Sequence, residues 1–227
     1  MEIAPGVHSV GLLGARGFLV CERELTLIDS GLPGSRRRLE RHLTRIGRSM
    51  DDLRRVVVTH AHPDHIGGVR EMTADNNAEV LMHPDDVTAL TVSLREAWDE
   101  RDRSKLLAYF TQGPHAATPL HDGDELPVMG GLRVVHTPGH TPGSICLYAP
   151  RHRVLFTGDV LQVIRGHVTF ASRIFSADMP AARGSVARLA ELDVATIAFA
   201  HYPPWRDDAN GVLRRLAQRA EALAANA

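Results

Sequence analysis

Three histidines and an aspartate lie within six positions of the chain, directly after the Val-rich run 55–59, which by composition is a buried strand. The segment reads Thr59-His60-Ala61-His62-Pro63-Asp64-His65-Ile66-Gly67-Gly68. A strand end would hold His60 and His62 in a fixed relation, and a helix starting at Asp64 would present that carboxylate and His65. Neutral imidazoles and carboxylates are zinc ligands, and so many in so short a span would repel one another on protonation unless a cation held them. The segment therefore predicts a metal site rather than the alternative, a surface cluster of histidines.

Composition limits the remaining classes of function. The chain has 227 residues, of which 44% are hydrophobic and 13 are histidine, and its formal net charge is −1. A sizeable core is therefore expected, and a nucleic-acid partner is not. No apolar run reaches the roughly 20 residues that cross a bilayer, and residues 1–14 do not resemble a signal peptide, so we expect a cytoplasmic protein without a membrane partner. Cys21 and Cys146 stand in apolar runs and are expected to be buried free thiols.

The first part of the chain reads as a strand meander followed by a helix. Short apolar runs at 7–13, 17–21 and 25–28 are separated by turn-forming residues and predict hairpins. From Ser35 to Gly47 the apolar residues recur at helical spacing. Five arginines fall largely on the other face of this helix, and we interpret them as a solvated face rather than a phosphate groove: Arg36, Arg37, Arg38, Arg41 and Arg45.

The rest of the chain repeats this pattern. We expect a strand at 55–59, a short helix from Asp64, strands at 79–82, 132–136, 144–148, 154–156 and 196–200, a helix capped by Asp178 and a closing amphipathic helix at 212–223. A mostly helical insert is expected at about 85–113. Residues 1–227 are therefore interpreted as a single domain built of two similar halves.

Three later positions also suit metal ligands. His140 lies between two Pro-Gly steps in Thr137-Pro138-Gly139-His140-Thr141-Pro142-Gly143-Ser144. Asp159 ends Phe156-Thr157-Gly158-Asp159, where a buried carboxylate is costly unless it is paired or metal-bound. His201 follows the predicted strand 196–200.

These motifs, in this order, resemble the metallo-β-lactamase superfamily, whose signature is His-x-His-x-Asp-His after a strand. The resemblance covers nearly the whole chain, including Leu27-Ile28-Asp29-Ser30-Gly31 and the turn Asp122-Gly123-Asp124. It implies an α+β fold, the four-layer αβ/βα sandwich of that family. It also implies that His60, His62 and His140 hold one metal, that Asp64, His65 and His201 hold a second, and that Asp159 bridges the two. Asp29 would support a ligating histidine through its other ring nitrogen.

The other histidines receive more ordinary interpretations. His136 precedes the second motif on its strand and is read as structural. His83 before Pro84 is either a helix-entry residue or a neighbour of the pocket. The remaining histidines are read as surface residues: His8, His42, His115, His121, His152 and His167.

Two zinc ions, with iron or manganese as alternatives, would lower the pKa of a shared water and stabilise an oxyanion. We therefore expect a dizinc-bound hydroxide that attacks an ester, thioester, lactone or amide carbonyl of a small substrate, with Asp64 and Asp159 as the catalytic carboxylates. The pattern is closest to the glyoxalase II-like hydrolases, but only 26 residues follow His201. We therefore do not expect the glutathione-binding C-terminal part of that family.

Two other classes of function remain open. Related proteins use one non-haem iron held by two His and an Asp to oxidise persulfides, and His60, His140 and Asp159 could form such a set. A non-catalytic binding module would be expected to have lost a ligand. For the substrate, we expect Trp98, Tyr109 or Phe110 of the insert, together with Tyr202, to contact a small apolar acyl group. The oligomeric state does not follow from the sequence.

Overall fold

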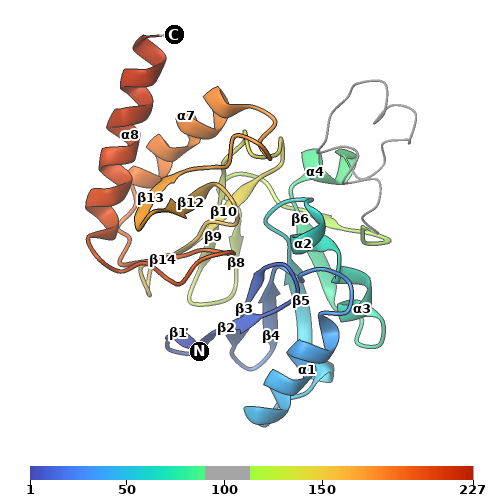
Figure 1. The fold of residues 1–227 in the computed structure, drawn as a ribbon. Helices are drawn as coiled ribbons and strands as arrows, with labels where there is room; N and C mark the ends of the chain where they lie inside the picture. Colours follow the sequence, from blue (N-terminus) through green and yellow to red (C-terminus); the bar gives the residue numbers. More distant parts are fainter. Residues whose placement is uncertain (90–112, 227) are drawn as a thin grey trace. The chain divides into compact units, whose positions relative to one another are not determined.

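The computed structural model describes residues 1–89 and 113–226. The predicted insert therefore lies outside the described residues except at its two ends, as do Trp98, Tyr109 and Phe110. The chain divides into two compact units, Met1–Leu120 and His121–Ala227 (Figure 1). Each unit has its own sheet and its own helices. That the whole chain acts as one domain stays a prediction.

The N-terminal unit is built on one sheet whose strand order follows the chain, β1-β2-β3-β4-β5-β6-β7. These strands are β1 (Glu2–Ala4), β2 (Val7–Gly11), β3 (Arg16–Cys21), β4 (Leu25–Ile28), β5 (Leu53–Val57), β6 (Glu79–Met82) and β7 (Thr118–Pro119). The first four strands pair antiparallel, as the predicted hairpins require, and β4 to β7 pair parallel. Because β4 and β5 are parallel neighbours, the residues that follow them, Asp29 and Thr59, reach the same edge of the sheet.

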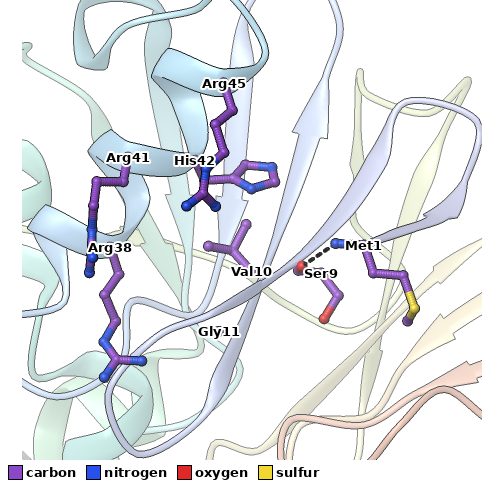
Figure 2. A pocket seen from close by; sticks show the side chains of 8 residues that line it. All are labelled: Met1, Ser9, Val10, Gly11, Arg38, Arg41, His42 and Arg45. Atoms are coloured by element: carbon purple, nitrogen blue, oxygen red, sulfur yellow. Dashed lines mark hydrogen bonds between the residues drawn. The ribbon is translucent and has the colours of Figure 1, made fainter.

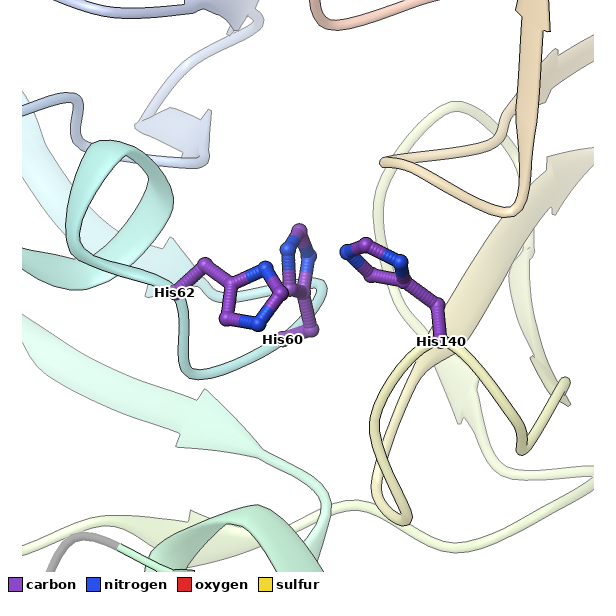
Figure 3. A group of neighbouring side chains, drawn as sticks. All are labelled: His60, His62 and His140. Atoms are coloured by element: carbon purple, nitrogen blue, oxygen red, sulfur yellow. The ribbon is translucent and has the colours of Figure 1, made fainter. Parts of the chain in front are cut away.

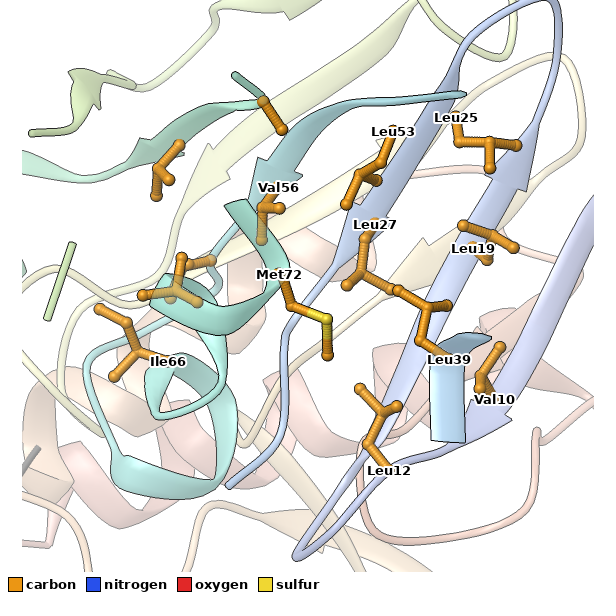
Figure 4. Packing of buried hydrophobic residues seen from close by; sticks show 14 of the residues in the cluster. Val10, Leu12, Leu19, Leu25, Leu27, Leu39, Leu53, Val56, Ile66 and Met72 are labelled. Carbon is orange, nitrogen blue, oxygen red and sulfur yellow. The ribbon is translucent and has the colours of Figure 1, made fainter. Parts of the chain in front are cut away.

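Helices cover one face of this sheet. They are α1 (Arg36–Arg45), the 3-10 helix η1 (Met50–Asp52), α2 (Pro63–Ile66), α3 (Val69–Thr73) and α4 (Pro84–Ala89). Figure 4 shows Leu39 of α1, Ile66 of α2 and Met72 of α3 packed on strand residues such as Leu27 and Val56. All five of these side chains are fully buried. Each stabilises the unit by about 1.5–3 kcal/mol relative to an exposed position.

The C-terminal unit repeats the pattern of antiparallel strands followed by a parallel one. Its main sheet has the order β14-β11-β10-β9-β8, in which only β11 and β14 pair parallel. The strands are β8 (Glu125–Leu126), β9 (Leu132–His136), β10 (Ile145–Ala149), β11 (Val154–Phe156) and β14 (Thr196–Ala198), and the helices are α7 (Met179–Ala190) and α8 (Ala209–Ala225). Asp178 caps α7 as predicted, since its side chain accepts a hydrogen bond from the N–H of Ala181 at 2.9 Å. A separate hairpin, β12 (Leu161–Ile164) with β13 (His167–Phe170), was not predicted.

Two sequence expectations about single side chains can be compared with the structure. Cys146 is a buried free thiol, and burial raises its pKa to about 12, whereas Cys21 is only half-buried. His8 and His42 are not plain surface residues. Both are half-buried, and Nε2 of His42 lies 3.2 Å from Nδ1 of His8 because α1 packs on β2.

Within the described residues, the helices are all too short or too polar to span a bilayer.

Candidate metal centre

The N-terminal ligand group consists of His60, His62, Asp64 and His65, all placed by the end of β5 and the start of α2. His62 has an extended backbone and precedes the helix, and Pro63 occupies its first position, where the fixed proline φ suits a helix start. Figure 3 shows His60 and His62 on this connection. The predicted strand and helix around the motif are therefore present, with the helix beginning one residue before Asp64.

The imidazoles of this group crowd together in the interior. The ring of His60 lies with its centroid 4.7 Å from that of His62 and 4.0 Å from that of His65. All three residues are buried, whereas the side chain of Asp64 keeps 30% of its surface exposed, with Oδ2 3.9 Å from Nε2 of His65. Nitrogen and carboxylate donors so close together form a donor set that zinc, iron or manganese accepts.

Asp29 sits beneath the N-terminal ligand group and binds it. Its Oδ1 accepts a hydrogen bond from the N–H of Thr59 at 2.8 Å, and its Oδ2 lies 2.8 Å from Nδ1 of His65. The hydroxyl of Thr59 lies 3.0 and 2.9 Å from the two carboxylate oxygens and 3.1 Å from Nδ1 of His60. A carboxylate can only accept a hydrogen bond, so the contact between Asp29 and His65 assigns the proton of His65 to Nδ1 and its basic lone pair to Nε2. Asp29 reaches this position with a left-handed backbone, φ 60°, which Asp tolerates better than most residues.

Two contacts of this group were not anticipated. The carboxylate of Asp86 in α4 is fully buried and accepts a hydrogen bond from the N–H of Ala61 at 2.7 Å, between the two leading histidines. Nothing in the sequence distinguishes this aspartate from the other charged residues around it. Gly14 supplies the second contact: it has φ 81°, and a Cβ there would come within 2.6 Å of Cβ of Asp64. The β2–β3 hairpin thus needs a glycine where it passes the aspartate.

The C-terminal ligand group consists of His140, Asp159 and His201. His140 is buried in the turn between β9 and β10, as Figure 3 also shows, and its Nδ1 lies 3.2 Å from Oγ of Ser176. The hydroxyl of Ser176 donates its proton to the carbonyl of Ser172 at 2.6 Å, so its oxygen accepts from His140. The basic lone pair of His140 therefore also lies on Nε2.

Asp159 lies between the two histidines of this group. Its Oδ2 is 3.7 Å from Nε2 of His140, and its Oδ1 is 3.2 Å from Nε2 of His201. Asp159 follows β11 and His201 follows β14, and these strands pair parallel with Phe156 opposite Ala198. The parallel register explains how residues about 40 positions apart arrive at one sheet edge. Within the unit, the carboxylate can share a cation with both rings.

The remaining predicted positions are distributed as follows. His136 bonds the carbonyl of Pro142 through Nε2 at 2.9 Å, and so holds the turn that carries His140. His83 is a helix-entry residue, because its Nδ1 accepts a hydrogen bond from the N–H of Asp85 at the start of α4, at 3.3 Å. The ring of Tyr202 packs edge-on against Phe199, with the centroids 6.0 Å apart.

The family model described as the metallo-beta-lactamase superfamily matches residues 12–201. Among curated proteins, the chain is 31% identical over 163 residues to the uncharacterized protein YobT of Bacillus subtilis. This alignment covers 67% of this chain and 64% of YobT. It is 37% identical over 112 residues to the acyl-coenzyme A thioesterase MBLAC2 of Gallus gallus, over 46% of this chain and 40% of that one. It is also 25% identical over 246 residues to the probable metallo-hydrolase YflN of Bacillus subtilis, over 95% and 92% of the two chains. The match thus spans less than two thirds of YobT and of MBLAC2.

Solved structures agree on the fold. A metallo-beta-lactamase family protein from Thermus thermophilus superimposes with a TM-score of 0.76 at 25% identity, over 99% of this chain and 80% of that one. The protein TTHA1623, solved in a di-iron-bound form, superimposes with a TM-score of 0.68 at 28% identity, over 92% and 97% of the two chains. The predicted fold class, α+β with two similar halves, is therefore confirmed.

Proposed function

Because the chain belongs to the metallo-β-lactamase superfamily, we propose that it is a metal-dependent hydrolase acting on an ester, thioester, lactone or amide carbonyl of a small substrate. The single observation that carries the proposal is the N-terminal ligand group. The buried rings of His62 and His65 have their centroids within 4.7 Å of that of the buried His60 ring, and His65 is held by a buried carboxylate. A protein that only needed to fold would gain more stability from apolar residues at these positions.

The proposed ligand sets follow the family pattern. His60, His62 and His140 hold one metal ion, Asp64, His65 and His201 hold a second, and Asp159 is shared. The donor chemistry supports this assignment, since His60, His65 and His140 each have a hydrogen-bond partner at Nδ1 that leaves Nε2 as the coordinating nitrogen. When bound, the two ions would supply Lewis acidity and a water of lowered pKa.

The chain's own residues then have distinct tasks. Asp29 and Ser176 keep the rings of His65 and His140 oriented through the hydrogen bonds given above. Asp64 is the carboxylate of the N-terminal ligand group that reaches solvent, with 30% of its side chain exposed, and it can carry a proton between the reacting centre and water. The negative charge of Asp159 attracts the rings of His140 and His201 and keeps them in place.

We favour a thioester with an apolar acyl group as the substrate. MBLAC2 is named as an acyl-coenzyme A thioesterase, and two large apolar side chains stand in the loop that leads to Ser176. Ile174 is 71% exposed and Phe175 56% exposed, although such side chains are normally buried. Phe175 immediately precedes the serine that binds His140, so this loop can offer an apolar surface near that ligand. Trp98, Tyr109, Phe110 and Tyr202 remain proposed contacts for the acyl chain.

The proposed metal is zinc at two equivalents per chain. The alternative is a persulfide-oxidising enzyme with one iron held by His60, His140 and Asp159. Iron is found in TTHA1623, where two ions are bound. Element analysis of the purified protein separates these proposals, because two equivalents of zinc support the hydrolase and a single iron with no zinc contradicts it.

The substrate is tested with a panel of thioesters, lactones and phosphodiesters. Thioesters should give the highest kcat/KM, and Phe175→Ala, Tyr109→Ala and Phe110→Ala should reduce the preference for longer acyl chains by about three- to tenfold. Ile164→Ala provides a matched control, since this residue is 50% exposed but lies at the end of β12 rather than in the loop that leads to Ser176. Phosphodiesters as the best substrates, or unchanged chain-length preference in all three variants, would contradict the proposed acyl recognition.

A further inference from the structure

A pocket of about 290 Å³ lies between α1 and β2 in the N-terminal unit (Figure 2). Its titratable side chains are all basic. The lining consists of Arg38, Arg41, His42 and Arg45 from α1, with Ser9, Val10 and Gly11 from β2 and Met1 beside them. None of these residues belongs to either ligand group, so the pocket needs an explanation of its own.

The three arginines line the pocket together because of their spacing. Positions 38, 41 and 45 follow one another by three and four residues, so they share a face of α1. Leu39 and Leu43 are fully buried and fix the rotation of the helix on the sheet. The arginine face is exposed, as the sequence predicted, but the side of it next to β2 borders an open pocket.

The arginines that line the pocket lack the carboxylate partners that commonly neutralise charged side chains on a solvated helix face. Arg36, on the same helix, pairs with Glu40 at 2.7 Å and with Asp75 at 2.9 Å. Over residues 1–89 and 113–226, by contrast, Arg38, Arg41 and Arg45 have no ion pair within 4.0 Å, although Nε of Arg41 donates to the carbonyl of Arg37 at 3.2 Å. The pKa of His42 is lowered, first by burial and then by positive neighbours that include His8 and Arg45. The chain as a whole has a net charge of only −1, so this charge is local.

The backbone of β2 adds a donor to the same place. The N–H of Ser9 donates to the carbonyl of Met1 at 2.8 Å, so this amide points toward the β1 edge of the strand. Amides two residues apart on a strand point in the same direction, so the N–H of Gly11 faces that edge as well.

These features define the chemistry of the occupant. Guanidinium groups bind oxyanions through paired N–H donors, and a phosphate offers several acceptor oxygens and up to two negative charges. A volume of about 290 Å³ is at the small end of the roughly 300–1,000 Å³ typical of ligand pockets, which suits one or two phosphate groups rather than a polymer. We propose that this pocket binds the phosphate or diphosphate group of a small phosphorylated molecule through Arg38, Arg41 and Arg45.

The test uses the metal-loaded full chain and follows the imidazole NMR signals of His42, which lines the pocket, and of His8, which contacts His42. Pyrophosphate, inorganic phosphate and glycerol phosphate are titrated separately against sodium chloride at equal ionic strength. We expect a saturable shift of the His42 signals, and Arg38→Gln and Arg45→Gln should weaken binding by about tenfold each. Arg37→Gln removes the same charge from the same helix outside the pocket and should change the affinity less than about twofold. Arg38→Lys keeps the charge without the planar fork and should lose affinity to a smaller extent than Arg38→Gln.

The outcomes separate the sources of the ligand. Equal affinity for all three compounds identifies free phosphate as sufficient, whereas tighter binding of pyrophosphate or glycerol phosphate identifies a diphosphate or a phosphate ester. Shifts no larger than those caused by sodium chloride, or equal losses in the Arg37→Gln and Arg38→Gln variants, would overturn the proposal. Phosphate bound by metal ions elsewhere leaves the His42 signals unmoved, so failure here does not bear on the proposed hydrolase activity.

Discussion

Asp29 holds His65 across 36 residues of sequence, with its Oδ2 2.8 Å from Nδ1 of the imidazole. The aspartate follows β4 and the histidine lies in α2, after the neighbouring strand β5, so the parallel pairing of those strands brings them together. Both side chains are almost completely shielded from solvent. The hydrogen bond therefore operates in a region of low dielectric, where it is strong and where losing it is costly.

Replacing Asp29 by Ala should weaken metal binding, because His65 loses the partner that sets its tautomer and ring orientation. Losses of about 10–100-fold in metal affinity are typical for such partners. Competition with a chromogenic chelator measures the effect. Asp75→Ala is the control, since that carboxylate is 72% exposed and pairs only with Arg36 among the described ion pairs. Equal metal affinity in the two variants would show that Asp29 has only a folding role.

Replacing Asp159 by Ala should remove most of the activity, by about a hundredfold or more, because the carboxylate between His140 and His201 is lost. Metal content should fall below two equivalents. Replacing His136 by Ala removes its hydrogen bond to the carbonyl of Pro142 and should cost about 1 kcal/mol of stability with a much smaller loss of activity. Kinetics and element analysis of both variants check this, and equal losses of activity would mean that His136 is more than structural.

Replacing Gly139 by Ala should destabilise the C-terminal unit by about 2 kcal/mol or more. Gly139 has φ 128°, and a Cβ there would come within 2.0 Å of the backbone nitrogen of Ala182 in α7. Neither backbone can yield, because the carbonyl of Gly139 accepts a hydrogen bond from the N–H of Asp178, the α7 cap. Gly166→Ala is the matched control, since its φ is 77° but nothing lies within 4 Å of the added Cβ, and it should cost about 1 kcal/mol. Urea unfolding measures both, and equal costs would exclude the steric explanation.

Asp122 should make stability depend on acid pH. The hydrogen bond from Arg188, at 2.6 Å, is the main reason that the pKa of Asp122 lies below its ordinary value, and the N–H of His136 adds to it. A lowered pKa stabilises the fold above about pH 4, and this contribution is lost as the pH falls through the folded-state pKa. Because the carboxylate is 44% exposed, its contribution should stay below about 1 kcal/mol.

Urea unfolding of Asp122→Asn at several pH values tests this prediction. The variant should be less stable than wild type at pH 7, and the difference should shrink below about pH 4. Arg188→Gln should reproduce most of the effect. A difference that is unchanged at low pH would mean that the charge of Asp122 does not contribute.

The sequence predicted well those elements whose signal is local. Strands β4, β6, β9 and β11 have the predicted bounds because each is a compact apolar run ended by polar or turn residues. The hairpin of β12 and β13 was missed because its strands are only partly buried, so their composition does not mark a core. Strands β7 and β8 have two residues each and exist only because a neighbouring strand offers hydrogen-bond partners.

The candidate ligands were also proposed from the sequence, since several histidines and an aspartate directly after a buried strand suit a metal site, and their role as ligands stays a prediction. What only the tertiary structure decided are the relationships between distant segments. Examples are the contact of Asp29 with His65, the buried Asp86 on the N–H of Ala61, and the arginine pocket between α1 and β2. The sequence of α1 shows that its arginines share a face, but whether that face meets solvent alone or closes over a strand depends on how the helix packs. How the helix packs depends on which side chains are buried across the whole sheet, so a local pattern of residues cannot predict it.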